Sequence, residues 1–306
     1  MVVKKVYDIA FLGHYTKDTI VSAERTRVVD GGAFNYGSHL AVRMGLRVAA
    51  ITRLAQEDFH VVEELKKLGV DVFAQATPHS TCLRLEYPTS NVDERVIYIT
   101  SSAGPFTPSE VRDIASKAFV IGASVRGEVS LEVIEELRKK ETILSADVQG
   151  FIRIVHKGKL VFKDWPEKEK VLAMVDVLKT DAVEAELLTG KKDIRLSAKV
   201  LSDFGPKEVV ITHSNGLLVY DGNHFYETSF YPKQLIGRSG RGDTCIASYV
   251  ARRLMAPPSE AILWAAALTS LKMEAEGPFR RDIREVEELI QKKYRWSPTG
   301  KHVVPC

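Results

Sequence analysis

The chain is predicted to form an α/β fold in which helices cover both faces of a mostly parallel central sheet. The first observation behind this prediction is that short β-branched runs alternate with segments of helical periodicity along most of the sequence. Such alternation is typical of parallel strands joined by crossover helices. The second observation is that no repeat, low-complexity tract or Pro/Gly/Ser-rich linker interrupts the 306 residues. Residues 1–306 are therefore expected to form a single domain.

The strands of this sheet are expected where short apolar runs rich in β-branched residues occur, namely at 8–12, 48–54, 119–121, 142–147, 175–179 and 209–212. Helices are expected between them, at 33–44, 60–68, 108–115, 131–139, 167–174 and 182–188. The run Thr107-Pro-Ser-Glu110 is a capping box with proline at the first helical position. Gly45 and Gly69 are expected to end the helices before them. Beyond the Pro257-Pro258 pair the chain is predicted to be mainly helical, over 259–276 and 282–294.

Two segments, 19–29 and 82–100, have strand composition without an intervening helix. They are predicted to form hairpins outside the main sheet, with lid segments at about 15–30 and 80–100. A small sheet of this kind would cover the ligand crevice, or it would serve as the interface of a homodimer. The sequence leaves both roles open.

Composition excludes several classes of function. The net charge is only +3 and the Lys and Arg residues are spread along the chain, so neither nucleic acid nor an anionic membrane surface is an expected partner. Three cysteines far apart, Cys82, Cys245 and Cys306, argue against a disulfide framework and fit a reducing compartment. No signal-peptide pattern or apolar run of the roughly 20 residues that span a membrane is found. The expected location is the cytoplasm.

The segment Gly-Arg-Ser-Gly-Arg-Gly-Asp-Thr-Cys, residues 237–245, places three glycines and one acid just ahead of an apolar helical pattern. Glycine lets backbone N–H groups approach a ligand closely, and the N-terminus of a helix favours an anion. In that field the carboxylate of Asp243 would stay ionised and would accept a proton from a substrate hydroxyl. The other interpretation is a loop in which Asp243 only caps the helix. The local sequence does not separate the two.

Three more segments place polar residues where a ligand would be held. Gly31 and Gly32 open a helix that carries Asn35 in its first turn, and Asn35 can donate and accept hydrogen bonds to hydroxyls. Asp18 follows the first strand and Gln149 follows another, at the sheet edge where open α/β folds bind ligands. Tight turns or solvated loops would explain these segments equally well.

Taken together, the four segments resemble the PfkB/ribokinase family of carbohydrate kinases. The glycine pair with Asn35, followed by Met44-Gly45 and by Leu54-Ala-Gln-Glu-Asp58, is similar to the N-terminal signature of that family, and Gly240-Arg-Gly-Asp243 is similar to its C-terminal signature. Between them, residues 179–190 resemble the Asn-x-x-Glu segment and residues 209–216 the nucleotide-side strand and turn. The resemblance spans about residues 6–290, and two signatures in the right order are far more specific than either alone.

The resemblance implies a ribokinase-like fold with a β-sheet lid and phosphoryl transfer from ATP, with Mg²⁺, to a hydroxyl of a small sugar, polyol or nucleoside. Asp243 would be the base, and the amides of Gly240, Arg241 and Gly242 would form an anion hole. The acceptor would be bound by Asp18, Gly31, Gly32, Asn35 and Gln149. The metal would be organised by Glu184 and Asp181, and the nucleotide side would be formed by Lys179, Asp181, Glu184, Thr212, Ser214 and Gly216.

Two residues depart from the family pattern. Arg241 stands where alanine is usual, and Asp181 stands where asparagine is usual. We hypothesise that Arg241 contacts the phosphates of the donor; the alternative is a surface arginine that points away. The runs Gly13-His-Tyr-x-x-Asp18 and Asp147-Val-Gln-Gly-x-x-Arg153 look most like the myo-inositol kinase branch, although ribose, fructose or nucleoside acceptors would need similar side chains.

Other classes of function are less compatible with the sequence. A nicotinamide dehydrogenase would need its glycines in an N-terminal βα unit, a P-loop kinase would need a Gly-x-x-x-x-Gly-Lys-Ser/Thr run, and the eight histidines lack metal-ligand spacing. The remaining alternatives are a nucleoside kinase and a non-catalytic sugar or nucleotide binding protein on the same fold. Asp243 argues against the binding protein, because binding alone does not require a base.

Overall fold

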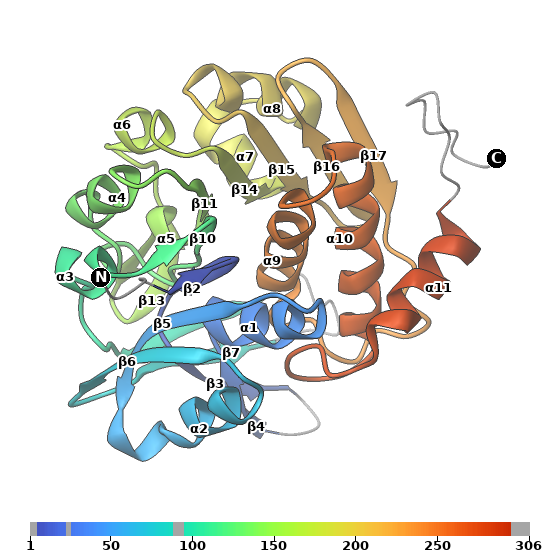
Figure 1. Ribbon diagram of the computed structural model, residues 1–306. Coiled ribbons are helices and arrows are strands. Elements are labelled where there is room, and N and C mark those ends of the chain that lie inside the picture. Colours follow the sequence, from blue (N-terminus) through green and yellow to red (C-terminus); the bar gives the residue numbers. More distant parts are fainter. Residues whose placement is uncertain (1–4, 23–25, 88–94, 295–306) are drawn as a thin grey trace.

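The computed structural model describes residues 5–22, 26–87 and 95–294 (Figure 1). Within these ranges a nine-stranded sheet has the order β17-β16-β15-β14-β11-β10-β2-β5-β6. Its strands are β2 (Ile9–Leu12), β5 (Val48–Ala55), β6 (Asp71–Thr77), β10 (Ala118–Ile121), β11 (Ile143–Asp147), β14 (Val177–Asp181), β15 (Glu208–Thr212), β16 (Gly216–Tyr220) and β17 (Phe225–Ser229). All pairings from β15 to β6 are parallel, whereas β16 pairs antiparallel with both of its neighbours. The predicted mostly parallel sheet is therefore confirmed.

Helices cover both faces of this sheet, and each face has its own hydrophobic core. One core receives residues from α1 (Ala33–Arg43), α2 (His60–Lys67), α9 (Arg241–Arg253), α10 (Pro258–Met273) and α11 (Ile283–Lys293). The other receives residues from α3 (Pro108–Arg112), α4 (Leu131–Arg138), α5 (Gln149–Ile152), α6 (Lys168–Leu172), α7 (Ala182–Thr189) and α8 (Ile194–Asp203). Within β2, Phe11 packs into the first core while Ala10 and Leu12 pack into the second, as a strand buried on both faces requires.

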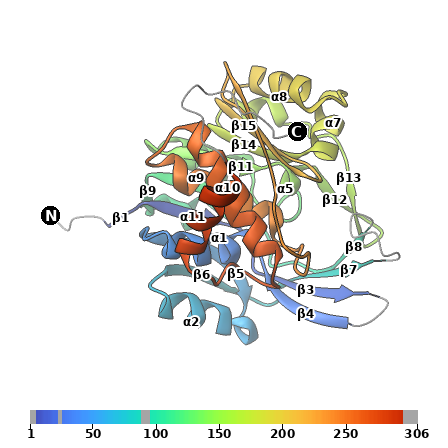
Figure 2. The same cartoon turned by 90° about the vertical axis from the view of Figure 1, so that its right-hand side faces the viewer.

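A second sheet, which we call the lid sheet, lies to one side of the main sheet (Figure 2). Its order is β12-β13-β8-β7-β3-β4, with β3 (Thr16–Val21), β4 (Thr26–Gly31), β7 (Thr81–Glu86), β8 (Val96–Ser101), β12 (Arg153–His156) and β13 (Lys159–Phe162). The two predicted hairpins correspond to the antiparallel pairs β3–β4 and β7–β8. Residues 88–94, within the second of these predicted segments, lie outside the described residues.

The hairpin β12–β13 was not predicted. Its two-residue turn, Lys157-Gly158, has positive φ at both positions, 50° and 79°, which is the geometry of a type I′ hairpin turn. The signal was weak because lysine is an unusual residue for the first of these positions. The hairpin extends the lid sheet beyond the two predicted segments.

The boundaries of several elements also differ from expectation. The helix expected over 108–115 ends at Arg112, because Ala115–Ser116 (β9) pairs with Val6–Tyr7 (β1) in a short parallel ladder. The helix α8 and the strands β6, β16 and β17 were not among the predicted elements. The capping box at Thr107 is present, and Gly45 and Gly69 adopt φ of 79° and 88° just beyond the helices that they end. Among the described residues, no helix has the length and apolar character to cross a membrane.

Candidate active site

Two adjoining cavities lie beneath the lid sheet, at the carboxyl ends of the parallel strands. The inner cavity has a volume of about 70 Å³, and the outer cavity has a volume of about 820 Å³. Their linings share six residues, which are Arg95, Ile97, Gln149, Arg153, Gly240 and Asp243. Ligands in the two cavities would therefore lie next to each other, with these six residues at the boundary between them.

The turn before α9 is built around Gly240. Gly240 is the N-cap of α9 in the left-handed region, with φ of 76°. A Cβ atom there would lie 2.3 Å from the ring of Tyr36, so both the backbone conformation and the packing require glycine. Because Gly240 is the N-cap, Asp243 is the third residue of the helix. The interpretation of Asp243 as the helix cap is therefore wrong.

The expected anion hole is only partly available. The amide of Arg241 donates to the carbonyl oxygen of Arg238 at 3.2 Å, so it is engaged within the turn. The amides of Gly240 and Gly242 lie at the start of α9, where N–H groups have no partner along the helix. Gly242 also sits against a cation, because a Cβ atom there would lie 2.8 Å from Nζ of Lys179. The ammonium of Lys179 and the amides at the start of α9 thus meet at this turn.

Asp243 reaches the surface of both cavities, and protein atoms surround it elsewhere. Burial and the nearby carboxylate of Asp147 raise the pKa of Asp243 to about 6, although Lys179, Arg153 and Lys272 oppose the rise. A carboxyl with this pKa is ionised at neutral pH and is a better base than an ordinary aspartate.

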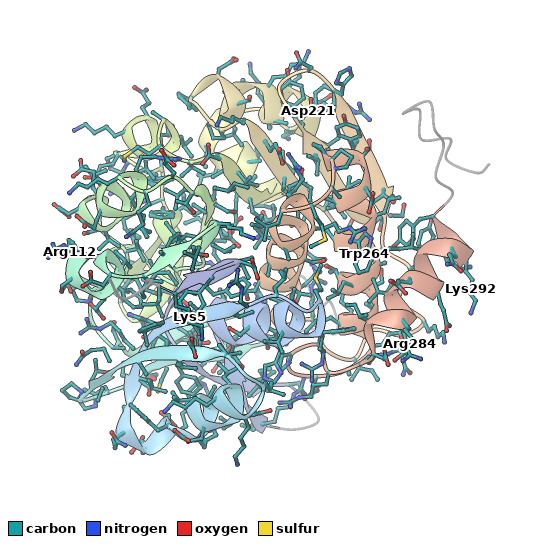
Figure 3. The ribbon with its side chains drawn as sticks, viewed as in Figure 1. Lys5, Arg112, Asp221, Trp264, Arg284 and Lys292 are labelled. Atoms are coloured by element: carbon teal, nitrogen blue, oxygen red, sulfur yellow. The ribbon has the colours of Figure 1, made fainter. Side chains whose placement is uncertain are left out.

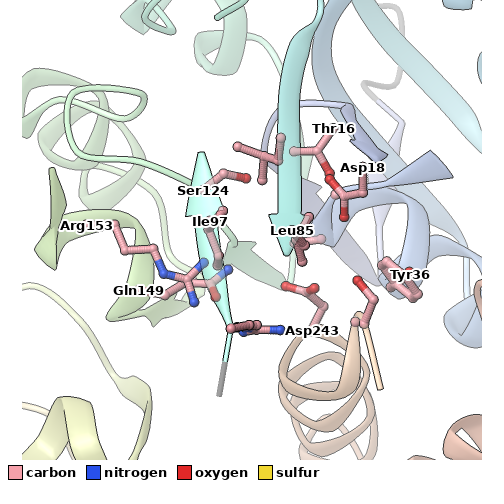
Figure 4. A pocket seen from close by; sticks show the side chains of 15 residues that line it. Thr16, Asp18, Tyr36, Leu85, Ile97, Ser124, Gln149, Arg153 and Asp243 are labelled. Atoms are coloured by element: carbon pink, nitrogen blue, oxygen red, sulfur yellow. The ribbon is translucent and has the colours of Figure 1, made fainter. Parts of the chain in front are cut away.

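Asp18 lies on β3, on the opposite wall of the inner cavity from Asp243 (Figure 4). It is only 6% exposed, and its Oδ1 atom has no hydrogen-bond partner among the described residues. Burial raises the pKa of Asp18 to about 7, and the charge of Asp243 adds to the rise while a hydrogen bond from Thr16 opposes it. A buried carboxylate oxygen without a partner, facing a cavity, is suited to accept a hydrogen bond from a ligand hydroxyl.

The glycine pair brings β3 against the start of α1. A Cβ atom on Gly31 would lie 2.4 Å from Oγ1 of Thr16 and 2.8 Å from Oδ2 of Asp18. Gly32 is the N-cap of α1 with φ of 98°, and a Cβ atom there would lie 2.2 Å from the carbonyl oxygen of His14. Gly32 lines the inner cavity, whereas Gly31 does not. Because Gly31 has no side chain, the carboxylate of Asp18 can occupy the space beside it.

The two amide side chains expected at the acceptor are placed differently. Gln149 lines both cavities, and its Nε2 atom is 3.5 Å from the carbonyl oxygen of Ala123. Asn35 is buried in the first turn of α1 and is not among the lining residues. Its Nδ2 atom donates to the carbonyl oxygen of Asp30 at 3.2 Å, and its Oδ1 atom has no partner among the described residues. In this arrangement Asn35 supports the turn beside the cavity.

A buried cluster of charges lies where the two cavities meet the carboxyl ends of β11 and β14. Nζ of Lys179 is 2.9 Å from Oδ2 of Asp147, and a guanidinium nitrogen of Arg153 is 4.0 Å from Oε1 of Glu184. Burial disfavours the ammonium of Lys179, but the surrounding carboxylates outweigh it and raise its pKa. Burial raises the pKa of Glu184 to about 7, with Lys179 opposing. The Nε atom of Arg153 has no partner among the described residues.

Asp181 and Glu184 form a reciprocal capping box at the start of α7. The amide of Asp181 donates to Oε2 of Glu184 at 2.9 Å, and the amide of Glu184 donates to Oδ1 of Asp181 at 2.8 Å. No cluster of three or more His, Cys, Asp or Glu side chains suited to a metal occurs in the described part of the chain. Both carboxylates line the outer cavity, and such a pair would nevertheless suit Mg²⁺, which keeps several waters and takes few protein ligands.

Most of the residues expected on the donor side line the outer cavity. Among them are Lys179, Asp181, Glu184, Thr212 and Ser214, together with the three residues of the turn. Gly216 is not brought to the cavity. It begins β16, and a Cβ atom there would lie 2.0 Å from the carbonyl oxygen of Thr228 on β17, so its role in the structure is close strand packing.

Several lining residues were not identified as site residues from the sequence. Arg153 lies at the end of a recognised motif and Ser239 lies within the glycine segment 237–245, but neither was assigned a role; Arg95 and Tyr36 gave no local signal. The outer cavity is lined by six cationic side chains, Arg95, Arg153, Lys159, Lys179, Arg238 and Arg241, and by only three carboxylates, Asp181, Glu184 and Asp243. This excess of positive charge favours a polyanionic ligand.

Residues 6–280 match the model of the pfkB family carbohydrate kinases. The chain therefore belongs to this family, and it is a phosphotransferase of the class that acts on hydroxyl acceptors.

Solved structures and a characterised enzyme resemble the chain over most of its length. A "Pyrophosphate-dependent kinase in the ribokinase family complexed with a pyrophosphate analog and myo-inositol" is 37% identical, with a TM-score of 0.84 over 92% of this chain and 99% of that chain. A pyrophosphate-dependent myo-inositol-1 kinase that two substitutions convert into a myo-inositol-3 kinase is 36% identical, with a TM-score of 0.84 over 94% of this chain and 100% of that chain. The cytidine kinase of Thermococcus kodakarensis (strain ATCC BAA-918 / JCM 12380 / KOD1) is 24% identical over 80% of this chain and 87% of that enzyme. The ribokinase-like fold predicted from the sequence is confirmed.

Proposed function

We propose that the chain transfers a phosphoryl group from inorganic pyrophosphate to a hydroxyl of a cyclic polyol, with myo-inositol as the first acceptor to test. The observation that supports pyrophosphate is Arg241, which stands within the glycine turn and lines the outer cavity with five other cations. Two solved structures that are 36% and 37% identical to the chain are of pyrophosphate-dependent kinases, one with myo-inositol bound. Their acceptor supports the choice of a polyol.

The acceptor would lie in the inner cavity between Asp18 and Asp243. Its reactive hydroxyl would donate to Asp243, and a second hydroxyl would donate to the unpartnered oxygen of Asp18. Leu83, Leu85 and Ile97 from the lid sheet line the same cavity and would pack on the C–H groups of the ring. Exclusion of water by these side chains would strengthen the polar contacts beneath them.

In the reaction, Asp243 takes the proton of the acceptor hydroxyl as the new O–P bond forms. The bond between the transferred phosphorus and the bridging oxygen of the donor breaks, and phosphate leaves into the outer cavity. Lys179 and the amides at the start of α9 would stabilise the charge on the transferred group, and Arg153 would contact it from the junction of the cavities. Asp181 and Glu184 would hold Mg²⁺, which would supply positive charge beside the donor.

ATP, the donor that the family resemblance implies, is the second candidate for the phosphoryl donor, and a separate observation supports it. One wall of the outer cavity is apolar, formed by Leu160, Val161 and Phe162 of β13 and by Val183 of α7. Such a wall would accept a nucleobase. The cytidine kinase similarity likewise makes a nucleoside the second acceptor class.

The experiment is a matrix of donors and acceptors. Pyrophosphate and ATP, each with Mg²⁺, are incubated with myo-inositol, ribose, fructose and cytidine, and phosphorylated product is quantified. We expect the highest kcat/KM for pyrophosphate with myo-inositol, and Asp243→Asn should lower kcat by about 10²–10⁴-fold, the usual range for loss of a general base. Turnover with ATP alone would reject the proposed donor. Ligand binding without any turnover would favour the non-catalytic alternative.

A further inference from the structure

Lys272 lies near the end of α10 and is 2% exposed although it carries an ammonium group. Its Nζ atom donates to the carbonyl oxygen of Gly237 at 2.8 Å and also to that of Ser239. The same atom lies 5.3 Å from the centroid of the Tyr36 ring, a favourable position for a cation. Two backbone carbonyls and an aromatic face thus enclose this buried charge.

The two carbonyls belong to the turn that leads into α9. A peptide unit is planar and trans, so its C=O and N–H groups point in opposite directions. When the carbonyl of Ser239 points at Lys272, the amide of Gly240 must point away from it. Gly240 lines both cavities, and its amide is one of those expected to form the anion hole.

Other contacts from α10, and one from α1, hold the same turn. The amides of Ile236 and Gly237 both donate to the carbonyl oxygen of Met273, at 2.9 Å and 3.0 Å. The ring of Tyr36 occupies the space where a Cβ atom on Gly240 would lie. The end of α10 therefore accepts hydrogen bonds from the amides of 236–237 and, through Lys272, donates to the carbonyls of Gly237 and Ser239.

We propose that Lys272 is a positioning residue that fixes the anion-hole turn by drawing two of its carbonyls away from the active site. The inference rests on the proposed roles of this turn and of Asp243. Loss of the ammonium would leave the buried carbonyl oxygen of Gly237 and the part-buried one of Ser239 without this donor, and the peptide between Ser239 and Gly240 would be held less firmly. The amide of Gly240 would then be aimed at the transferred group only part of the time.

The same charge acts on the base. Lys272 is among the cations that oppose the rise in the pKa of Asp243. Burial lowers the pKa of Lys272 to about 8, while the carboxylates of Asp243 and Glu276 oppose that fall, and Tyr36 faces it from α1. The ammonium is therefore present at neutral pH, and kcat should decline as the pH rises through about 8.

The test compares Lys272→Met, which removes the charge and the donors, with Lys272→Gln, which keeps an N–H donor but no charge. Lys292→Met is the control, because Lys292 is 71% exposed on α11 (Figure 3). We expect Lys272→Met to lower kcat by about 10²-fold, comparable to loss of one oxyanion-hole donor, with little change in KM. Lys272→Gln should recover part of kcat but lose the decline near pH 8. Wild-type kcat in both variants would overturn the inference.

Hydrogen exchange of the amides at 237–242 provides a readout that does not require turnover. It should be faster in Lys272→Met than in wild type at matched global stability, and unchanged exchange there would reject the positioning role. If the wild type phosphorylates none of the acceptors, the proposed function fails, while the exchange experiment still decides the role of Lys272.

Discussion

Replacing Asp18 by asparagine should make the protein more stable at alkaline pH while it impairs acceptor binding. Burial raises the pKa of Asp18 to about 7, whereas an aspartate in the unfolded chain has a pKa near 3.9. The folded state therefore binds a proton more tightly than the unfolded state. The contribution of this group to stability is fully present below the unfolded pKa and is lost as the pH rises through about 7. A shift of roughly 3 pKa units corresponds to about 4 kcal/mol lost on ionisation.

Asp18→Asn removes this ionisation. We expect the variant to gain about 2–4 kcal/mol over wild type at pH 8, less than the full linkage value because Asp243 shares the shift and the site relaxes. At pH 4 both side chains are neutral in the folded state, and the advantage should nearly vanish. Urea denaturation of both proteins at the two pH values measures the difference, with the exposed Asp203→Asn as control. Equal effects at pH 4 and pH 8, or destabilisation at pH 8, would refute the reasoning.

Three further predictions concern the turn before α9. Gly240→Ala combines backbone strain in the left-handed region with the clash against Tyr36 and should lower kcat by about 10²-fold or more. Gly277→Ala is the control for the strain alone, because Gly277 has φ of 74° and no neighbour within 4 Å of an added Cβ atom. The control should leave kcat unchanged. Arg241→Ala should raise the donor KM by about tenfold, the effect of losing one charged contact worth about 1.4 kcal/mol, and unchanged kcat and donor KM would exclude contact with the donor. Because the pKa of Asp243 is raised to about 6, kcat/KM should fall about tenfold per pH unit below that value, and a flat profile down to pH 5 would remove Asp243 as the base.

The main sheet could be predicted because its signals are local. Strands such as β11 and β15 are apolar runs buried on both faces, and helix starts such as Thr107 carry their own capping residues. The lid sheet was only partly predictable. The pairing of β13 with β8 places Lys159 opposite Tyr98, and no local pattern encodes that juxtaposition.

The site, like the fold, has residues that the sequence could indicate and residues that it could not. Along the chain Asp18 and Gln149 come after strands of the main sheet, and Gly32 and Asp243 stand at the starts of helices. Sequence reasoning could therefore place them near one edge of the sheet. Lys272 lies 29 residues beyond Asp243 along the chain, within a helix that is apolar on nearly every side. Nothing in that helix indicates that its lysine turns inward to the carbonyls of another segment. Such contacts come from tertiary packing and were found only in the structure.

The connection between β11 and β12 is short, and this affects how easily water could replace the acceptor in the reaction. Asp147 ends a strand of the main sheet and Arg153 begins a strand of the lid sheet, with only the single turn of α5 between them. A lid that swung open at this edge would pull Arg153 away from the transferred phosphoryl group. The cluster of charges would then be complete only while the lid sheet is closed, and the donor would be hydrolysed less readily by water while it is open.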